Sequence, residues 1–219
     1  MYDLHTHSLL SDGALLPSEV AARYQNAGFK VIAICDHADY SNIDNIVDSI
    51  INFSRNWPAG SLIKVLPGVE LTHLPLSHFR PLAEYSRSKG VKIIVGHGQS
   101  PVEPVIAGTN RAALEAGIDI LAHPGLITDD DVMLAKERGT FLEITCRGGH
   151  DKGNRHVVKQ ALKFGAKLVI DTDSHSPSDI PTYEKMRQVG LKAGLKSDQV
   201  DRIFSDVREF LRTKGVELS

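Results

Sequence analysis

Histidines in this sequence gather where predicted β-strands end. Of the ten histidines in the 219-residue chain, six fall at or just after the carboxyl end of a short apolar segment. Chance would scatter them over helices and loops. Three carboxylates join them at the same level, and imidazole with carboxylate is a donor set that suits Zn, Mn and Fe. The pattern predicts a metal centre with nine candidate ligands: His5, His7, Asp12, His37, Glu70, His97, His123, Asp173 and His175.

The local spacing of these residues has physical content. His5 and His7 lie two positions apart on a predicted strand, so both side chains leave the same face. The last predicted strand ends with the same spacing, in Asp171, Asp173 and His175. In a closed barrel the first and last strands are neighbours, which would bring the two groups together. Asp3 and Asp171 are candidate partners for the outer ring nitrogens of metal-bound histidines.

Nine ligands are too many for one ion and suit two or three, with Glu70 available to bridge them. Three divalent ions would bring more positive charge than three carboxylates cancel. Such a site attracts a phosphate dianion and stabilises negative charge that develops during reaction. Metal-bound water with a lowered pKa then serves as the nucleophile, without any Ser or Cys.

The elements that must position these residues alternate regularly. Strands are expected over 2–7, 30–37, 62–71, 91–97, 119–123, 140–146 and 167–173, and helices over 17–27, 42–56, 76–89, 110–116, 129–138, 155–164, 181–193 and 198–214. Continuously apolar strand cores are typical of parallel strands covered on both faces. Seven strand–helix units predict one α/β domain over 1–219, a closed parallel barrel with outer helices. Right-handed crossovers place every strand's carboxyl end on one side, where active sites form.

Composition narrows the class of protein. The chain is 42% hydrophobic and 24% charged with a formal net charge of -2, which argues against binding extended nucleic acid. It contains neither a signal-peptide pattern nor an apolar run of about 20 residues, so we expect a cytoplasmic protein without membrane association. Cys35 and Cys146 lie in apolar stretches and are expected to be buried, reduced thiols.

Taken together and in order, these motifs resemble those of the PHP family, named for polymerase and histidinol phosphatase. The opening DLHTHS..SDG (Asp3 to Gly13) is similar to the family's first motif. The later segments CDH (35–37), GVE (68–70), GHG (96–98), AHPG (122–125) and DTDSH (171–175) are similar to the remaining ones. The resemblance runs from Asp3 to His175 and fills every ligand position that the family pattern requires.

The resemblance implies a distorted (β/α)7 barrel, TIM-like in layout, with a trinuclear metal centre of Zn, Mn or Fe. By family pattern, one metal is held by His5, His7, Glu70 and Asp173, a second by Glu70, His97 and His123, and a third by Asp12, His37 and His175. Members include histidinol-phosphate phosphatases, other phosphoesterases, nucleases and polymerase-associated domains. Because no polymerase sequence is present here, the resemblance implies a free-standing enzyme.

Further residues are candidates for the mouth of the barrel. Arg147 is placed to bind phosphate through its forked guanidinium, with a surface salt bridge as the alternative. His150 is a candidate proton donor to the leaving group, or else a solvated loop histidine. Lys152 and His73 are candidate substrate-binding residues, and Glu143 is expected to be an interior or supporting carboxylate. Asp12 has an alternative as a turn or capping residue within SDG.

These observations predict a metal-dependent hydrolase acting on a small phosphomonoester, and the resemblance implies histidinol phosphate as its substrate. Catalysis is expected to depend on Glu70, Asp173 and His150. A phosphodiesterase or nuclease acting on nucleotides or strand ends is the alternative, and a non-catalytic barrel module is a third. The apolar stripe of the segment 198–214 is expected to face the core, with homo-oligomer contact as the second use of that stripe.

Overall fold

The computed structural model describes residues 1–216, in which strands and helices alternate along the chain. The strands are β1 (Tyr2–Thr6), β2 (Val31–Ile34), β3 (His37–Ala38), β4 (Lys64–Leu71), β5 (Ile93–His97), β6 (Ile120–Ala122), β7 (Phe141–Thr145) and β8 (Leu168–Asp171). The helices are α1 (Pro17–Asn26), α2 (Ile43–Asn56), α3 (Phe79–Lys89), α4 (Thr109–Glu115), α5 (Asp129–Arg138), α6 (Asn154–Phe164), α7 (Tyr183–Lys192) and α8 (Ser197–Thr213).

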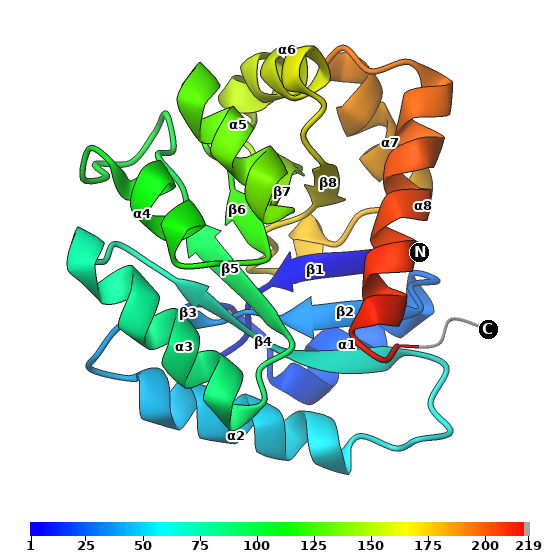
Figure 1. Cartoon of the computed structure of the whole chain (residues 1–219). Coiled ribbons are helices and arrows are strands. Elements are labelled where there is room, and N and C mark those ends of the chain that lie inside the picture. The colour runs from blue at the N-terminus through cyan, green and yellow to red at the C-terminus, as the bar shows by residue number, and fades with distance from the viewer. Residues whose placement is uncertain (217–219) are drawn as a thin grey trace.

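The strands form a parallel sheet that curls into a nearly closed barrel with the helices outside it (Figure 1). Their order is β1-β2-β4-β5-β6-β7-β8, and the short β3 pairs beside β4. Strands β1, β2, β5, β6, β7 and β8 are buried along their whole length, as expected for parallel strands covered on both faces. The predicted seven-stranded β/α barrel is confirmed.

The barrel closes through an irregular seam between β1 and β8. Near the mouth, the segments that end β1 and follow β8 share an isolated bridge between Thr6 and Ser174. There Asp173 N also donates to His5 O at 2.9 Å. Farther from the mouth, side-chain carboxylates rather than backbone carbonyls accept the hydrogen bonds between β1 and β8. Asp171 Oδ1 accepts from Leu4 N at 2.8 Å, and Asp3 Oδ1 accepts from Thr172 N at 3.2 Å. The distortion of the barrel therefore lies at this seam, beside the first group of candidate ligands.

The strand expected over 30–37 is broken in two, which the sequence pattern did not indicate. β2 ends at Ile34 and β3 begins at His37. Between them Asp36 is buried, and its carboxylate accepts hydrogen bonds from Ser8 N and Ser8 Oγ, each at 2.7 Å, and from Ser11 Oγ at 2.7 Å. The break thus anchors the loop that carries Asp12 next to the strand that carries His37.

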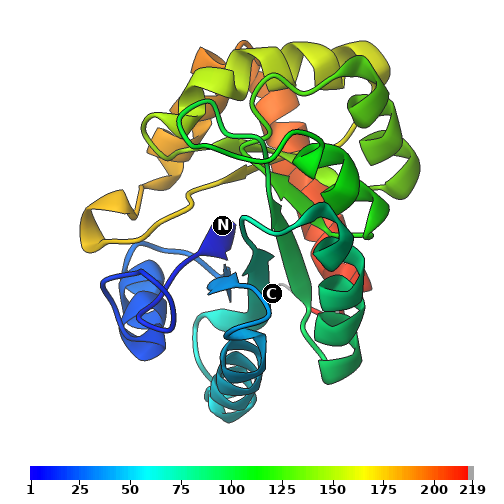
Figure 2. The ribbon, with the colours of Figure 1, turned by 90° about the vertical axis from the view of Figure 1, so that its left-hand side faces the viewer.

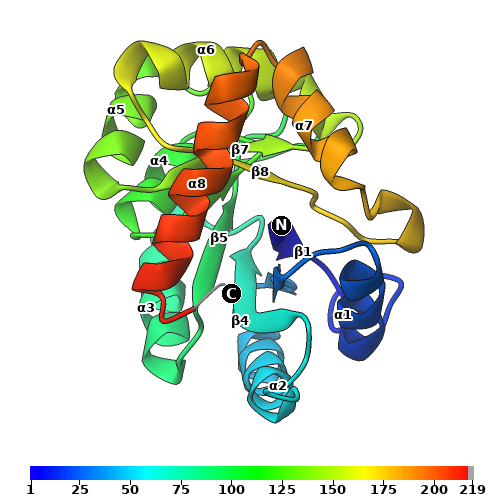
Figure 3. The same ribbon diagram turned by 90° about the vertical axis from the view of Figure 1, so that its right-hand side faces the viewer.

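The carboxyl-terminal helix covers the end of the barrel opposite the mouth (Figure 3). The ring of Phe204 packs on Tyr2 at 5.4 Å between centroids, and that of Phe210 packs on Phe141 at 5.1 Å. Lys214 Nζ forms an ion pair with Asp119 Oδ1 at 2.7 Å, next to the start of β6. The apolar stripe of α8 therefore faces the core, as its periodicity predicts.

Two helix starts differ from expectation by more than one residue. α7 begins at Tyr183 rather than at Pro181, because Thr182 caps it by accepting from Lys185 N at 3.3 Å. α3 begins at Phe79, after a single 3-10 turn over Leu76–His78. Both cysteines are free thiols, Cys35 fully buried and Cys146 partly so. Within residues 1–216, none of the helices combines the length and apolar character needed to cross a membrane.

Candidate metal centre

The candidate ligands converge at the mouth of the barrel, the end toward which β1 and β2 point in Figure 1 and which faces the viewer in Figure 2. Parallel strands deliver their carboxyl ends to one side, so residues far apart in sequence meet there. β1 carries His5 with His7 just beyond it, β3 carries His37, and β4 carries Glu70. His97 ends β5, His123 follows β6, and Asp173 and His175 follow β8.

The first group combines His5, His7 and Asp173, which meet across the seam. The two Nε2 atoms of the histidines lie 3.1 Å apart. Asp173 Oδ1 lies 3.2 Å from His7 Nε2 and 3.8 Å from His5 Nε2. Their donor atoms all fall within 4.8 Å of one another, a spacing that a single ion can span. The sequence prediction that the two ends of the chain share one site is therefore matched by the geometry.

Glu70 lies at the centre of the cluster and faces several imidazoles at once. Its Oε2 lies 2.6 Å from His37 Nδ1 and 3.6 Å from His5 Nε2, while its Oε1 lies 4.0 Å from His123 Nε2. Burial would raise the pKa of this carboxyl, but the charges of His37 and His5 hold it well below its usual value. A carboxylate in this place can bridge two cations.

A second group consists of Glu70, His97 and His123. Both histidines are buried, and their rings meet edge to face with centroids 4.6 Å apart. Close backbone packing holds the two strand ends together. A Cβ on Gly98 would lie 2.2 Å from Ala122 O, so only glycine allows this approach.

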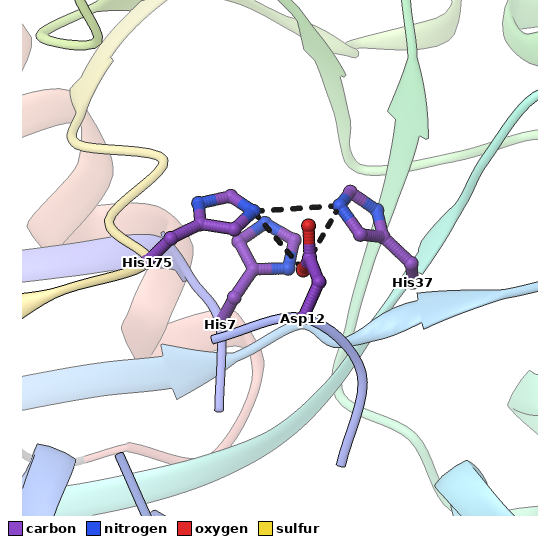
Figure 4. A group of neighbouring side chains, drawn as sticks. All are labelled: His7, Asp12, His37 and His175. Atoms are coloured by element: carbon purple, nitrogen blue, oxygen red, sulfur yellow. Dashed lines mark hydrogen bonds and ion pairs between the residues drawn. The ribbon is translucent and has the colours of Figure 1, made fainter. Parts of the chain in front are cut away.

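The third group brings together His7, Asp12, His37 and His175 from three separate segments (Figure 4). Asp12 Oδ1 lies 3.2 Å from His175 Nε2 and 3.4 Å from His37 Nε2. The two histidine Nε2 atoms lie 3.4 Å apart. Asp12 thus faces the imidazoles rather than capping a helix, and α1 begins later, at Pro17. The second group contains the same residues as one ligand set implied by the family pattern, whereas the first lacks Glu70 and the third gains His7.

The donor atoms of these residues suit divalent cations, because several of them are buried without a hydrogen-bond partner in the cluster. Among residues 1–216, nine buried side-chain atoms have no hydrogen-bond partner of acceptable geometry, and six of them belong to this cluster. The six are His7 Nδ1, Glu70 Oε1, Glu70 Oε2, His97 Nδ1, Glu103 Oε2 and His123 Nδ1. Buried polar atoms without partners are costly, and the three orphaned carboxylate oxygens of Glu70 and Glu103 face imidazoles across spaces that suit a cation. Imidazole nitrogen and carboxylate oxygen are the donors that Zn, Mn and Fe accept.

The titration of the imidazoles reflects the same crowding. Burial lowers the pKa of His7 to about 4 and that of His123 to about 3, so both are neutral and ready to bind a cation at pH 7. Burial also lowers the pKa of His37, but Glu70 and Asp12 together outweigh it and raise that pKa to about 10. His37 must therefore lose a proton before it can bind a metal.

Glu143 is the carboxylate that orients the ligands from below. Its Oε1 lies 2.7 Å from His5 Nδ1, and its Oε2 accepts from His123 N at 2.8 Å. The expected partners of the imidazoles, Asp3 and Asp171, bind elsewhere. Asp3 Oδ2 accepts from Tyr24 Oη at 2.8 Å, and Asp171 serves the seam. The prediction for Glu143 is supported, whereas the supporting role expected of Asp3 and Asp171 is wrong.

Three residues at the mouth have left-handed backbone conformations that favour glycine. They are His73 (φ 51°), His123 (φ 28°) and Asp173 (φ 52°), the only non-glycine residues with positive φ within 1–216. Such strain costs about 1–3 kcal/mol at each position and clusters at functional sites. Its placement on three predicted site residues supports a functional role for each.

Arg147 and His150 both line the cavity above the cluster, which has a volume of about 360 Å³. The Arg147 guanidinium donates to Asp173 O at 2.9 Å and contacts His175 Nδ1. Part of its hydrogen-bonding capacity is therefore used on candidate metal ligands. His150 Nδ1 lies 3.0 Å from Ser100 Oγ, and its ring stands 4.5 Å from that of His123.

The other two predicted substrate residues lie in different surroundings. His73 lines the cavity, with its ring 4.5 Å from that of His97. Lys152 is exposed on the 3-10 turn His150–Gly153, outside the lining of the cavity. The sequence reasoning also missed one residue. Glu103, in the loop after β5, places Oε2 2.8 Å from His97 Nε2, and this contact lowers the pKa of the Glu103 carboxyl to about 2. It lies outside the strand ends, so the pattern that found the other ligands gave no signal for it.

Relatives of this chain include both phosphatases and nucleases by name. An uncharacterized protein of Methanocaldococcus jannaschii is 38% identical over 205 residues, covering 91% of this chain and 93% of that protein. A probable phosphatase of a Thermoanaerobacter species is 25% identical, covering 97% and 94%. The DNA polymerase/3'-5' exonuclease PolX of Bacillus subtilis is 27% identical, but the match covers 96% of this chain and only 40% of that longer protein.

Solved structures show the same architecture. A chain in a cryo-EM structure of archaeal ribonuclease P with mature tRNA has a TM-score of 0.72 at 18% identity, covering 96% of this chain and 90% of that chain. A Xaa-Pro dipeptidase with bound methionine has a TM-score of 0.65 at 12% identity, covering 98% and 75%. At such identities the likeness concerns the fold alone. The model of the PHP domain matches residues 3–196, so the chain belongs to the PHP family.

Proposed function

We propose that this protein is a metal-dependent phosphoesterase that hydrolyses a small phosphomonoester. The observation that carries the proposal is the setting of Glu70, whose two buried oxygens have no hydrogen bond of acceptable geometry although His5, His37 and His123 face them. Two or three divalent ions, of Zn, Mn or Fe, suit the three donor groups around it. When bound, such ions attract phosphate and lower the pKa of water enough for it to attack at neutral pH.

The chain's own residues would hold and orient the substrate. Arg147 lines the cavity with about a third of its side chain exposed, so its free edge is available to a phosphate oxygen. His150 is the proposed proton donor to the leaving group. Ser100 Oγ accepts from Val102 N at 3.3 Å, which favours donation of its own hydrogen to His150 Nδ1. The His150 Nε2–H would then face the cavity.

The charge around the cavity favours a small substrate over a polyanion. Asp12, Asp39 and Glu103 line it, whereas Arg147 is the one Arg or Lys among its lining residues within the described part of the chain. A nucleic-acid strand needs several phosphate-facing cations. An acidic rim instead suits a leaving group that carries positive charge, as histidinol phosphate does, and we propose that substrate first.

Hydrolysis of a phosphodiester or of an RNA end is the second candidate. A 5'-3' exoribonuclease of Haemophilus influenzae is 49% identical over 82 residues, which cover 33% of this chain and 30% of that protein. The donor groups at the mouth would serve either reaction, because both need a cationic site and activated water. The two candidates differ in the leaving group that the rim must accept.

The test is a phosphate-release screen over phosphomonoesters, dinucleotides and short oligonucleotides, with Zn, Mn and Fe supplied separately to metal-stripped protein. We expect turnover of a small monoester that disappears with chelator. Preferential cleavage of oligonucleotides, with a steep loss of rate as salt rises, would favour the nuclease candidate. Protein purified without chelators that holds less than one transition metal per chain would contradict both and leave the non-catalytic module.

A further inference from the structure

We propose that Glu103 is a tenth metal ligand, which completes the position formed by Glu70, His97 and His123. The inference rests on the proposed function, since it concerns an ion of the same centre. Glu103 lies in the loop between β5 and α4, outside the strand-end pattern that carries the other nine. Glu103 nevertheless lines the same cavity as six of those nine residues.

Three imidazoles face the Glu103 carboxylate. Oε2 lies 2.8 Å from His97 Nε2 and 3.8 Å from His73 Nε2, and Oε1 lies 3.6 Å from His150 Nε2. Although the side chain is about a third exposed, Oε2 itself is buried and has no hydrogen-bond partner of acceptable geometry among residues 1–216. A surface carboxylate would direct its oxygens to water, so this one is placed for a ligand within the cavity.

Side-chain hydrogen bonds tie together the two ends of the loop that carries Glu103. Asn110 Oδ1 accepts from Gln99 N at 2.8 Å, and Asn110 Nδ2 donates to Pro124 O at 3.0 Å. These bonds attach the start of the loop to the segment that follows His123. The two ends of the loop that carries Glu103 are therefore joined beside His97 and His123.

Two donor groups meet at His97, one with Glu70 and His123 and the other with His73 and Glu103. A neutral imidazole offers one lone pair and so binds one ion. The two groups cannot each hold an ion through His97, and we therefore join Glu103 to the first group. Donor atoms about 2.1 Å from one ion lie about 3.0–3.4 Å apart, so the 2.8 Å between His97 Nε2 and Glu103 Oε2 needs only a small expansion.

The resulting shell of two imidazoles and two carboxylates is a complete four-coordinate set for Zn and a partial one for Mn or Fe. The extra negative charge would hold this ion more tightly than Glu70, His97 and His123 could alone. Loss of that charge should therefore reduce the retention of one ion and leave the others unchanged.

The test compares Glu103→Gln with Asp39→Asn in the full-length protein. Asp39 lines the same cavity, but its carboxylate accepts hydrogen bonds from Ser41 N and Oγ at 2.7 and 2.6 Å. Both variants remove one negative charge near the centre. In dialysis of Zn-loaded protein against graded chelator, we expect Glu103→Gln to bind one ion at least about tenfold more weakly, and Asp39→Asn to match the wild type. Equal retention in all three proteins would overturn the inference.

A crystal structure of the wild-type protein loaded with Mn or Zn, with ions located by anomalous scattering, separates a ligand from an outer partner of His97. We expect an ion about 2.0–2.2 Å from a Glu103 oxygen. An ion bound to Glu70, His97 and His123 but more than about 3 Å from Glu103 would overturn this inference and leave the proposed function standing. No ion near Glu70 in loaded crystals would overturn both.

Discussion

Glu143 joins two parts of the metal centre from beneath, and its replacement by Gln gives the sharpest test of the geometry. The side chain is fully buried in β7, with one oxygen on His5 Nδ1 and the other on His123 N. Gln keeps the shape but offers one acceptor oxygen where the site uses two. If the amide group faces His5, it donates to Nδ1 and favours a hydrogen on Nε2, where a cation should bind. If it faces His123, two N–H donors oppose each other.

The magnitude follows from the lost interaction. A buried hydrogen bond to a charged group contributes about 1.5–3 kcal/mol. About 1.4 kcal/mol corresponds to a tenfold change in an equilibrium constant. The affinity for the ion held by His5, His7 and Asp173 should therefore fall roughly 10–100-fold. Losses of this size are typical when an outer partner of a metal-binding histidine is removed. The fold should persist, since no volume is lost from the core.

The assay is calorimetric titration of Zn or Mn into chelator-stripped protein, with far-ultraviolet circular dichroism to check the fold. Glu209→Gln is the matched control, because it makes the same chemical change at an exposed site where Glu209 pairs only with Arg212 within the described chain. We expect the control to bind metal as the wild type does. Wild-type affinity in Glu143→Gln would refute the reasoning that Glu143 fixes the ligands.

Three further predictions concern the centre and its frame. Glu70→Gln should lower phosphate release by about two orders of magnitude or more without unfolding the chain, because it removes the central negative charge; wild-type rates would remove Glu70 from the site. Metal binding at pH 7 should release a proton from His37, whose pKa is raised to about 10, so apparent affinity should rise with pH up to that value. Calorimetry in buffers of different ionisation enthalpy measures this release, and identical heats would contradict it. Gly98→Ala should lower Tm by about 2–12 °C, because the added Cβ would lie 2.2 Å from Ala122 O. Gly60→Ala is the control and should leave Tm unchanged, because the space around Gly60 is open. Equal Tm values for the two variants would contradict the close approach at Gly98.

Most of the fold could be predicted because its signals are local. Apolar runs mark β2, β5 and β8, and the spacing of apolar residues in α8 marks the face that covers the barrel. The break between β2 and β3 carried no such signal. It depends on Asp36, whose partners Ser8 and Ser11 are more than twenty residues away in sequence. A strand pattern reports which face is apolar, but it does not report where a buried carboxylate finds its donors.

The sequence by itself determined which residues reach the mouth of the barrel, because each predicted ligand but Asp12 lies at or just beyond a strand's carboxyl end. The resemblance implied three ligand sets, and the tertiary structure placed His7 beside the third of them. It also assigned Glu143, rather than Asp3 or Asp171, to the His5 ring, and it brought Glu103 to His97. The physical reason is the range of the interactions. Strand and helix periodicity depends on residues close together in sequence, whereas the partner of a buried charge depends on the packing of the whole barrel.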